Sequence, residues 1–179
     1  MTGPVCDSGN LMPVDEAISR LLSQVRPPPP VQKIPLDQAL GRVLASDIHS
    51  PVNLPAWDNS AMDGYALKAS DLPPAGGYLS VIGRIAAGAS DSSPLLPQQA
   101  VRIFTGAPLP PGADTVVPQE RCRVEGAQVW CPPVSVGEHV RKEGEEVRQG
   151  HLLLKAGKRL RAQELGFLAG AGIAQVEVY

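Results

Sequence analysis

The chain has 179 residues and a formal net charge of −2, with 43% hydrophobic and 19% charged residues. Its length and composition allow one good hydrophobic core or two small ones. The charge balance offers no basic surface to nucleic acid, so we expect no nucleic-acid partner. The longest apolar run, residues 167–174, is much shorter than a membrane span and is broken by glycines, so we expect no membrane partner either.

Proline and glycine are unusually frequent, with 19 and 18 residues, but they are spread along the chain and form no repeat. This distribution is typical of short strands joined by fixed turns and not of disorder. Aromatic residues make up only 4%, so the core must be aliphatic. The run Pro27–Pro30 predicts a stiff polyproline connector.

The cysteines and histidines show no metal-ligand spacing, so a zinc site is not expected. Cys6, Cys122 and Cys131 contain no Cys-x-x-Cys pair, and we expect ordinary thiols in a reducing cytosol. A disulfide between Cys122 and Cys131 stays open, because these two residues can face each other across a hairpin. The first residues lack the basic start and apolar centre of a signal peptide, and we expect a cytoplasmic protein.

In chain order, residues 1–10 are expected to form a mobile tail. An amphipathic helix follows, because apolar residues then recur at the spacing of one helical face. These residues are Val14, Ala17, Ile18, Leu21, Leu22 and Val25. Pro13 suits the first turn of this helix, and the acidic Asp15 and Glu16 complement its positive dipole end.

A second, short helix is expected over residues 36–42, followed by extended chain over 43–48. From about residue 60 to residue 140 the pattern changes to short strands separated by turns. The expected strands are 78–85, 100–104, 114–118, 119–124 and 128–131. Glu125-Gly126, between the last two, resembles a hairpin turn.

After residue 140 a strand is expected over 152–154, a helix over 161–171 and a final strand over 174–179. In the helix we expect Leu165, Leu168 and Ala169 to face inward, with Gly172 as the C-terminal stop. The chain ends on the last strand with no turn or tail, so we expect the native protein to continue beyond it.

Helical patterns at both ends of a central β region predict a fold that is mainly β with some α (α+β). We expect a discontinuous mixed α/β first domain made of residues 11–49 and 141–179. An inserted all-β domain of short strands should then occupy residues 50–140.

Residues 55–66 (Pro-Ala-Trp-Asp-Asn-Ser-Ala-Met-Asp-Gly-Tyr-Ala) place several oxygen-bearing side chains beside large apolar ones. Such oxygens suit a hard cation, and an Asp63-Gly64 turn would fix the direction of the carboxylate. In the alternative interpretation this is an ordinary turn, in which Asp63 bonds its own backbone. Asn59 and Ser60 either orient the Asp63 loop through hydrogen bonds to it or simply cap it. Asp58 can equally be a residue that forms a turn.

The second dense segment, residues 102–120, contains Thr105 followed by Gly106-Ala-Pro at the end of an extended run. The threonine hydroxyl and the N–H groups that follow it can bind an oxyanion. The alternative is a strand-end turn with a self-bonded hydroxyl. Another charged stretch, residues 141–148, mixes arginine and lysine with glutamate and predicts a solvated, salt-bridged face.

Both dense segments resemble signatures of the molybdopterin molybdenumtransferase family, that is, the MoeA family, to which the E domain of gephyrin also belongs. The strongest matches are 58–66 (Asp-Asn-Ser-Ala-Met-Asp-Gly-Tyr-Ala) and 102–108 (Arg-Ile-Phe-Thr-Gly-Ala-Pro). Residues 40–47, 112–120, 141–146 and 160–178 are similar to the family as well. The resemblance covers nearly all of the chain from about residue 11.

The resemblance implies an enzyme that inserts molybdate into adenylylated molybdopterin and releases AMP, with a divalent metal such as Mg²⁺. It also implies an elongated cytosolic homodimer, whose cleft lies between the pterin-binding domain of one subunit and the N-terminal region of the other. Asp63 and Thr105 match the functional Asp and Thr of that region, with Asp63 as a Mg²⁺ ligand. Asn59 and Ser60 are the expected substrate-binding residues.

Three features depart from the family pattern or limit what it implies. The pterin-binding and C-terminal domains are absent from this chain, so we expect these residues alone to be inactive. Glu146 stands where the family often has Asp, and Pro13 where it often has a helix-capping hydroxyl. A non-catalytic dimerisation or scaffold module of the same fold is the main alternative, and a small-molecule-binding β module is another.

Overall fold

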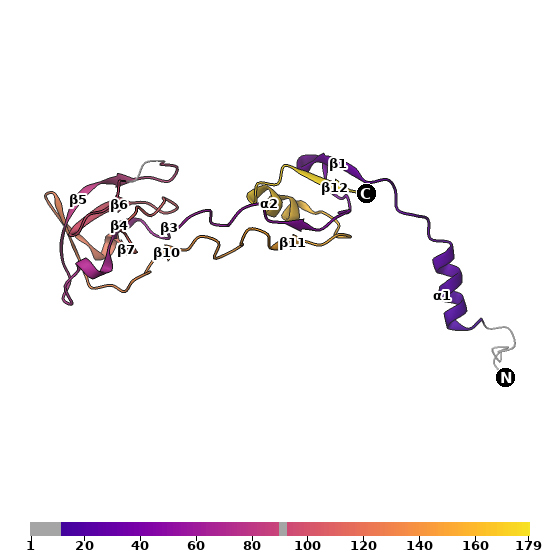
Figure 1. Ribbon diagram of the computed structural model, residues 1–179, viewed down its shortest axis with the longest axis horizontal. Coiled ribbons are helices and arrows are strands. Elements are labelled where there is room, and N and C mark those ends of the chain that lie inside the picture. Colours follow the sequence, from indigo (N-terminus) through magenta and orange to yellow (C-terminus); the bar gives the residue numbers. More distant parts are fainter. Residues whose placement is uncertain (1–11, 90–92) are drawn as a thin grey trace, which may run out of the picture.

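The computed structural model describes residues 12–89 and 93–179, so the expected tail at 1–10 and Cys6 lie outside the described residues. The described chain is mainly β with two α-helices, which confirms the predicted α+β class. Figure 1 shows an elongated arrangement: helix α1 stands apart, a small α/β body lies in the middle, and a β body lies at the far end. In the described part of the chain, neither α-helix is long and apolar enough to cross a membrane.

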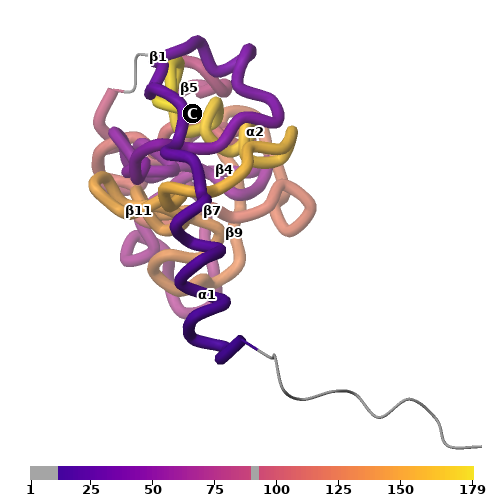
Figure 2. The backbone as a smooth tube through the Cα atoms, turned by 90° about the vertical axis from the view of Figure 1, so that its right-hand side faces the viewer, coloured from indigo at the N-terminus to yellow at the C-terminus, as the bar shows by residue number. Residues whose placement is uncertain are grey.

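Helix α1 spans Val14–Ser23 and confirms the helix predicted near the N-terminus. It starts after Pro13, and its first turn carries Asp15 and Glu16, whose carboxylates favour the positive end of the helix dipole. None of its residues is buried, and Leu21 is 68% exposed. Figure 2, seen from this end of the molecule, shows α1 extending away from the body behind it. The apolar face of α1 therefore contributes to no hydrophobic core of the described chain.

The α/β body combines two pairs of short antiparallel strands with helix α2 (Ala162–Gly170). Strand β1 (Gln32–Pro35) pairs with β12 (Gln175–Val178), and β2 (Ile48–His49) pairs with β11 (Leu152–Leu154). One core joins both ends of the chain and contains Leu36, Ala39, Leu44, Leu160, Leu168, Val176 and Val178. The helix and the two strands predicted after residue 140 are thereby confirmed.

Helix α2 begins with a capping box at Arg161, which supplies a partner for an otherwise unpaired backbone group. The Arg161 backbone N–H donates to Glu164 Oε2 at 3.0 Å, and its guanidinium Nη2 donates to Oε1 at 2.7 Å. Leu168 is buried as predicted and Leu165 is half-buried, but Ala169 is exposed. The burial predicted for Ala169 is wrong, because this residue lines an open groove between α2 and Leu36 and stays exposed there.

The prediction of a helix over residues 36–42 is also wrong. Only Leu36–Gln38 is helical, as the short 3₁₀ turn η2. Gly41 follows with a φ of +79°, a left-handed conformation that a right-handed helix cannot continue. Of the extended chain predicted over 43–48, only Ile48 belongs to a strand, β2. Val43 and Leu44 form isolated bridges before it.

The β body is a six-stranded sheet in the order β7-β4-β6-β5-β9-β8. Its strands are β4 (Gly64–Leu67), β5 (Gly77–Ile85), β6 (Gln99–Ile103), β7 (Thr115–Pro118), β8 (Arg123–Glu125) and β9 (Gln128–Cys131). Neighbouring strands run antiparallel, except that β5 and β6 run parallel. Side chains alternate between the faces: Tyr65 and Leu67 enter one apolar cluster and Ala66 the other. The sheet therefore has a hydrophobic cluster on each face.

Four of the predicted strands of this region are confirmed as β5, β6, β7 and β9. The strand predicted over 119–124 is wrong in its first half, where Gln119–Arg121 forms the 3₁₀ turn η4 directly after β7. The hairpin turn is Gly126-Ala127, because Glu125 still belongs to β8. A further 3₁₀ turn, η3 (Ala69–Asp71), follows β4.

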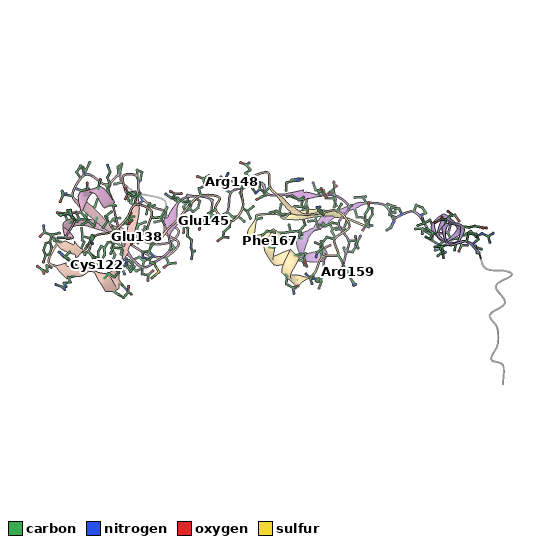
Figure 3. The ribbon with its side chains drawn as sticks, turned by 90° about the horizontal axis from the view of Figure 1, so that it is seen from below. Cys122, Glu138, Glu145, Arg148, Arg159 and Phe167 are labelled. Atoms are coloured by element: carbon green, nitrogen blue, oxygen red, sulfur yellow. The ribbon has the colours of Figure 1, made fainter. Side chains whose placement is uncertain are left out.

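Two chain segments join the bodies, and we call them the waist: residues 50–58 and 142–150. They hold each other by backbone hydrogen bonds such as Leu54 N–H to the Val147 carbonyl, at 2.7 Å. Figure 3 labels Glu145 and Arg148 on the waist, between Cys122 on one body and Phe167 on the other. Where the waist meets the β body, β3 (Asn59–Ser60) pairs antiparallel with β10 (Val140–Arg141). Domain boundaries at residues 50 and 140 stay a prediction.

The salt-bridged face predicted for residues 141–148 takes a different form. Lys142 pairs with Asp58 across the waist at 2.8 Å, and the Glu143 backbone N–H donates to the same carboxylate at 2.8 Å. These two donors, Lys142 first, lower the pKa of Asp58 below its ordinary value. Asp58 is therefore a structural link between the two segments of the waist.

Candidate functional site

Asp63 and Thr105, which are far apart in sequence, meet at one edge of the β body. Asp63 directly precedes β4, and Thr105 follows the end of β6 by two residues. The two strands are antiparallel neighbours with Gly64 opposite Ile103, so both side chains leave the sheet at the same point. The Asp63 Oδ1 atom accepts hydrogen bonds from the Thr105 backbone N–H and from the Thr105 hydroxyl, each at 2.8 Å.

Gly64 has a different role from the one that its sequence context predicts. The expected Asp63-Gly64 turn is wrong, because Gly64 is the first residue of strand β4. A Cβ atom at this position would lie 2.0 Å from the Val117 carbonyl oxygen of the neighbouring strand β7. Glycine is thus required at this position by the close approach of β7.

The Asp63 carboxylate is ionised at neutral pH and partly free. Its pKa lies below the ordinary value, chiefly because of the Thr105 backbone hydrogen bond, then the Thr105 hydroxyl, with a further contribution from the charge of Arg102. Both of these bonds end on Oδ1. Within the described residues Oδ2 has no hydrogen-bond partner, so this oxygen can take a cation or a donor from a ligand.

Thr105 cannot bind an oxyanion in the way that the sequence predicts. Its N–H and O–H are both directed to Asp63. The next two backbone N–H groups are also used, since Gly106 donates to the Ser60 carbonyl at 2.8 Å and Ala107 donates to the Phe104 carbonyl at 2.9 Å. Thr105 therefore orients the Asp63 carboxylate, and its side chain has only hydroxyl lone pairs left for a ligand.

Ser60 joins the two loops through its backbone. Its carbonyl accepts from Gly106, and its N–H donates to the Ala107 carbonyl at 3.0 Å. Its buried hydroxyl donates to the Met62 carbonyl at 2.5 Å and so closes the bend that leads to Asp63. The same hydroxyl accepts from the Met62 N–H at 3.3 Å, so Ser60 both caps this bend and ties it to the Thr105 loop, and its buried hydroxyl is not presented to a ligand.

The Asn59 side chain forms no hydrogen bond to Asp63 in the described structure. Its amide nitrogen donates to the Trp57 carbonyl at 3.2 Å, and its Oδ1 atom is buried with no hydrogen-bond partner in the described structure. Asn59 also lines a cavity of about 620 Å³ between the waist and α2. The other lining residues are Leu54, Pro55, Arg141, Glu146, Val147, Gly166, Phe167 and Gly170.

Sequence reasoning missed Arg141 and Glu146 as cavity residues. It assigned both to a solvated charged face, yet both line this cavity together with Asn59. Arg141 belongs to β10, which pairs with β3, and Glu146 lies in the waist, where its N–H donates to the Leu54 carbonyl at 3.0 Å. The alternation of charge along 141–148 gives no signal of these contacts.

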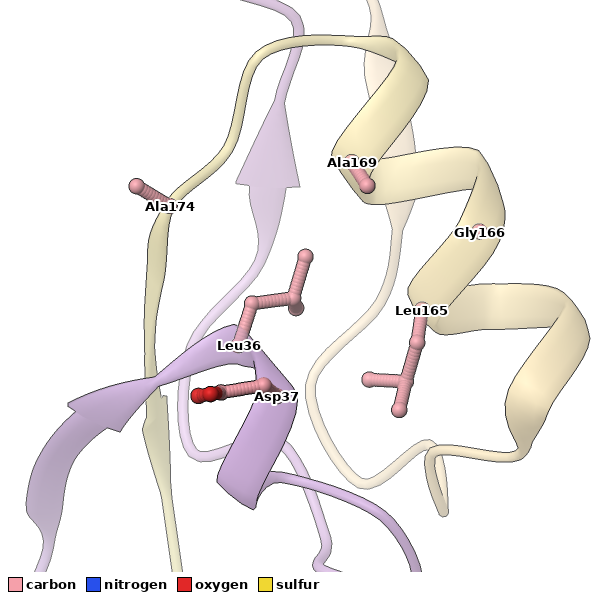
Figure 4. Close-up of a pocket in the computed structure, with 6 residues that line it drawn as sticks. All are labelled: Leu36, Asp37, Leu165, Gly166, Ala169 and Ala174. Carbon is pink, nitrogen blue, oxygen red and sulfur yellow. The ribbon is translucent and has the colours of Figure 1, made fainter.

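A second groove, of about 460 Å³, lies on the α/β body. Figure 4 shows it between η2 and α2, with Leu36 and Leu165 facing each other and Asp37 as its one carboxylate. It contains none of the predicted site residues. Among residues 12–89 and 93–179, no group of three His, Cys, Asp or Glu side chains is placed to hold a metal ion.

A family model described as "MoeA N-terminal region (domain I and II)" matches residues 12–172. The chain belongs to the MoeA family. A protein named molybdopterin molybdenumtransferase from Haemophilus influenzae is 37% identical over 171 residues, which make up 94% of this chain and 42% of that protein. A protein of the same name from Synechococcus elongatus is 38% identical over 172 residues, or 91% of this chain and 42% of that protein.

A solved structure of a MoeA molybdopterin biosynthesis protein from Pyrococcus horikosii has the same fold. It superposes with a TM-score of 0.86 at 32% sequence identity and covers 95% of this chain and 44% of that protein. The chain thus spans less than half the length of the MoeA relatives that it matches. The match includes Asp63, Thr105, Asn59 and Ser60, and their functional roles stay predictions.

Proposed function

We propose that this chain is the N-terminal region of a molybdopterin molybdenumtransferase acting in molybdenum cofactor biosynthesis. The complete enzyme inserts molybdate into adenylylated molybdopterin and releases AMP. One observation carries the proposal: Thr105 holds one oxygen of the Asp63 carboxylate with two donors and leaves the other oxygen free. The names of the relatives support the reaction class.

The Asp63 site fits Mg²⁺ as a single protein ligand. Mg²⁺ is commonly held by one or two carboxylates together with waters and substrate phosphates, and Asp63 offers one ionised carboxylate with a free oxygen. A bound Mg²⁺ would offset the negative charge on the departing AMP. Thr105 keeps Asp63 ionised and fixes its direction, and the backbone of Ser60 keeps the two loops together.

We place the residues that bind the pterin substrate outside these 179 residues. Two cytosolic subunits form a homodimer, and each N-terminal region presents Asp63 to the pterin-binding domain of its partner. The chain of 179 residues therefore has no transferase activity by itself. Ser60 supports the Asp63 loop, and the substrate contact of Asn59 is proposed at the cavity between the waist and α2, which this residue lines.

The test is a molybdate-insertion assay on the complete protein, with purified adenylylated molybdopterin and release of AMP as the readout. Asp63→Ala should lower the rate by about 100-fold or more, a loss typical of a group that acts on the transition state. Asp37→Ala, an exposed carboxylate on the α/β body, is the matched control and should stay near the wild-type rate.

Two outcomes would contradict the proposal. A folded Asp63→Ala enzyme with normal turnover removes the functional role of this carboxylate and favours the scaffold alternative. Measurable cofactor formation by the purified 179-residue chain overturns the proposal that the substrate site lies outside these residues.

A further inference from the structure

Arg102 is placed to control the geometry of the Asp63–Thr105 pair. It lies on β6, and its Nη1 atom donates to the Gly64 carbonyl at 2.8 Å and to the Ile103 carbonyl at 2.9 Å. Gly64 is the residue after Asp63, and Ile103 is two residues before Thr105. A single nitrogen therefore links β4 and β6 at the point where both functional side chains leave the sheet.

The other terminal nitrogen of the guanidinium extends this link through Gln119. Nη2 of Arg102 donates to Gln119 Oε1. The Gln119 backbone N–H donates in turn to the Asp63 carbonyl at 3.0 Å. The backbone of Asp63 is thus held through Gln119, while the backbone of Gly64 is held by Arg102 itself.

Aromatic rings restrain the plane of the same guanidinium. Its central carbon lies 4.5 Å from the Phe104 ring centroid and 5.5 Å from the Tyr65 ring centroid. These are the residues next to Thr105 and Gly64, and cation–π contacts of this kind favour one orientation of the group. Arg102 forms no salt bridge within the described part of the chain, so its charge is not committed to a carboxylate there.

We propose that Arg102 is a positioning residue: its guanidinium sets the separation of the Asp63 and Thr105 loops and so fixes the direction of the Asp63 carboxylate. This inference rests on the proposed function of Asp63 for its catalytic meaning. A lysine in its place would keep the charge but not the planar fork that bridges two carbonyls and a glutamine at once.

Arg84 provides a matched control for charge and stacking. Its guanidinium carbon also lies 4.5 Å from the Phe104 centroid, and it is paired with Arg102 across β5 and β6. Within the described residues, however, it donates no hydrogen bond to either loop. Replacing Arg84 therefore removes a similar cation from the Phe104 ring and leaves the hydrogen bonds of Arg102 to Gly64 and Gln119 in place.

The experiment measures amide hydrogen exchange at Thr105 in this chain for the wild type, Arg102→Lys, Arg102→Met and Arg84→Met. The Thr105 N–H is bonded to Asp63, so its exchange reports the pair directly. Exchange should accelerate about tenfold in both Arg102 variants, as expected for loss of a charge-assisted hydrogen bond, and stay unchanged in Arg84→Met. The Val129 amide, in the same sheet, serves as the reference for global opening. If Arg102→Met fails to fold, the lysine variant keeps the test usable.

Unchanged Thr105 exchange in folded Arg102→Lys overturns the positioning role. Equal acceleration in Arg84→Met also overturns it, because charge and stacking alone would then explain the effect.

In the complete enzyme, Arg102→Lys should lower kcat with little change in KM. A lower kcat without faster exchange of the Thr105 amide means that Arg102 contacts the substrate itself. That result also contradicts the proposal. Full activity of Asp63→Ala would refute the proposed function and leave the exchange result intact.

Discussion

The Asp63 carboxylate accepts two hydrogen bonds from Thr105, a residue 42 positions further along the chain. Both bonds end on one oxygen, and the second oxygen has no partner among the described residues. The antiparallel pairing of β4 and β6 produces this contact, because it brings Gly64 opposite Ile103. The sheet register is therefore what converts two separate sequence motifs into one site.

Thr105→Val should raise the pKa of Asp63 toward its ordinary value, since the hydroxyl donor is lost and the backbone donor remains. A lowered carboxyl pKa stabilises the fold above the ordinary pKa, and this contribution disappears as pH falls through the lowered value. NMR titration of the Asp63 carboxyl measures the change. Asp58, held by Lys142 instead, is the internal control, and a shift of both carboxyls would point to a general disturbance.

Gly64→Ala should destabilise the β body by about 3 kcal/mol or more, because the added carbon overlaps the backbone of β7. Gly83→Ala is the control, since the nearest atom to a Cβ there lies 4.0 Å away. Its effect should stay within about 1 kcal/mol in either direction. Urea unfolding measures both free energies, and equal values would show that the β4–β7 contact does not demand glycine.

Glu164→Gln should remove a pH-dependent part of the stability of the α/β body. The hydrogen bonds from Arg161, followed by other donors, lower the pKa of Glu164 to about 2. Its stabilising contribution is therefore complete above the ordinary pKa of 4.5 and is lost as pH falls toward about 2. The difference in Tm between wild type and variant should vanish in acid, whereas Asp37→Asn, an exposed carboxylate, should change Tm little at any pH. A difference that persists at low pH would contradict the ionic origin.

Cys122 should react with iodoacetamide before Cys131. The two free thiols face each other with sulfur atoms 3.6 Å apart. The hydrogen bond from Cys131 lowers the pKa of Cys122, whereas that same bond and burial raise the pKa of Cys131. The thiolate is the reactive form, so Cys122 is both more exposed and more nucleophilic. Peptide mass mapping follows each residue, and equal rates in the native chain would contradict this order.

The sequence predicts local elements well where periodicity is strong. Helix α1 and strand β5 follow from apolar spacing that needs no tertiary partner to be recognised. Residues 36–42 have a helical composition too, yet Gly41 adopts a left-handed conformation and the segment bends into the core. Tertiary packing overrode local propensity there.

The candidate site is less accessible to sequence reasoning. The resemblance to MoeA proteins names Asp63 and Thr105, but only the register of β4 against β6 shows that they touch. The need for Gly64 depends on β7, which follows some fifty residues later, so a turn was the natural expectation. Arg141 lines a cavity because β10 pairs with β3, and Glu146 lines it because its N–H donates to the Leu54 carbonyl across the waist. Charge patterning cannot reveal these contacts between distant segments.

A subunit-mixing assay tests the central claim most directly, namely that Asp63 acts on substrate held by the partner subunit. Complete Asp63→Ala protein is mixed with a variant that has an intact Asp63 and a disabled pterin-binding domain, and molybdate insertion is measured after exchange of subunits. Each parent should be inactive, and the mixture should recover about one quarter of the wild-type activity, because half of the dimers are mixed and each has one complete site. No recovery in mixtures that demonstrably contain mixed dimers would contradict the claim.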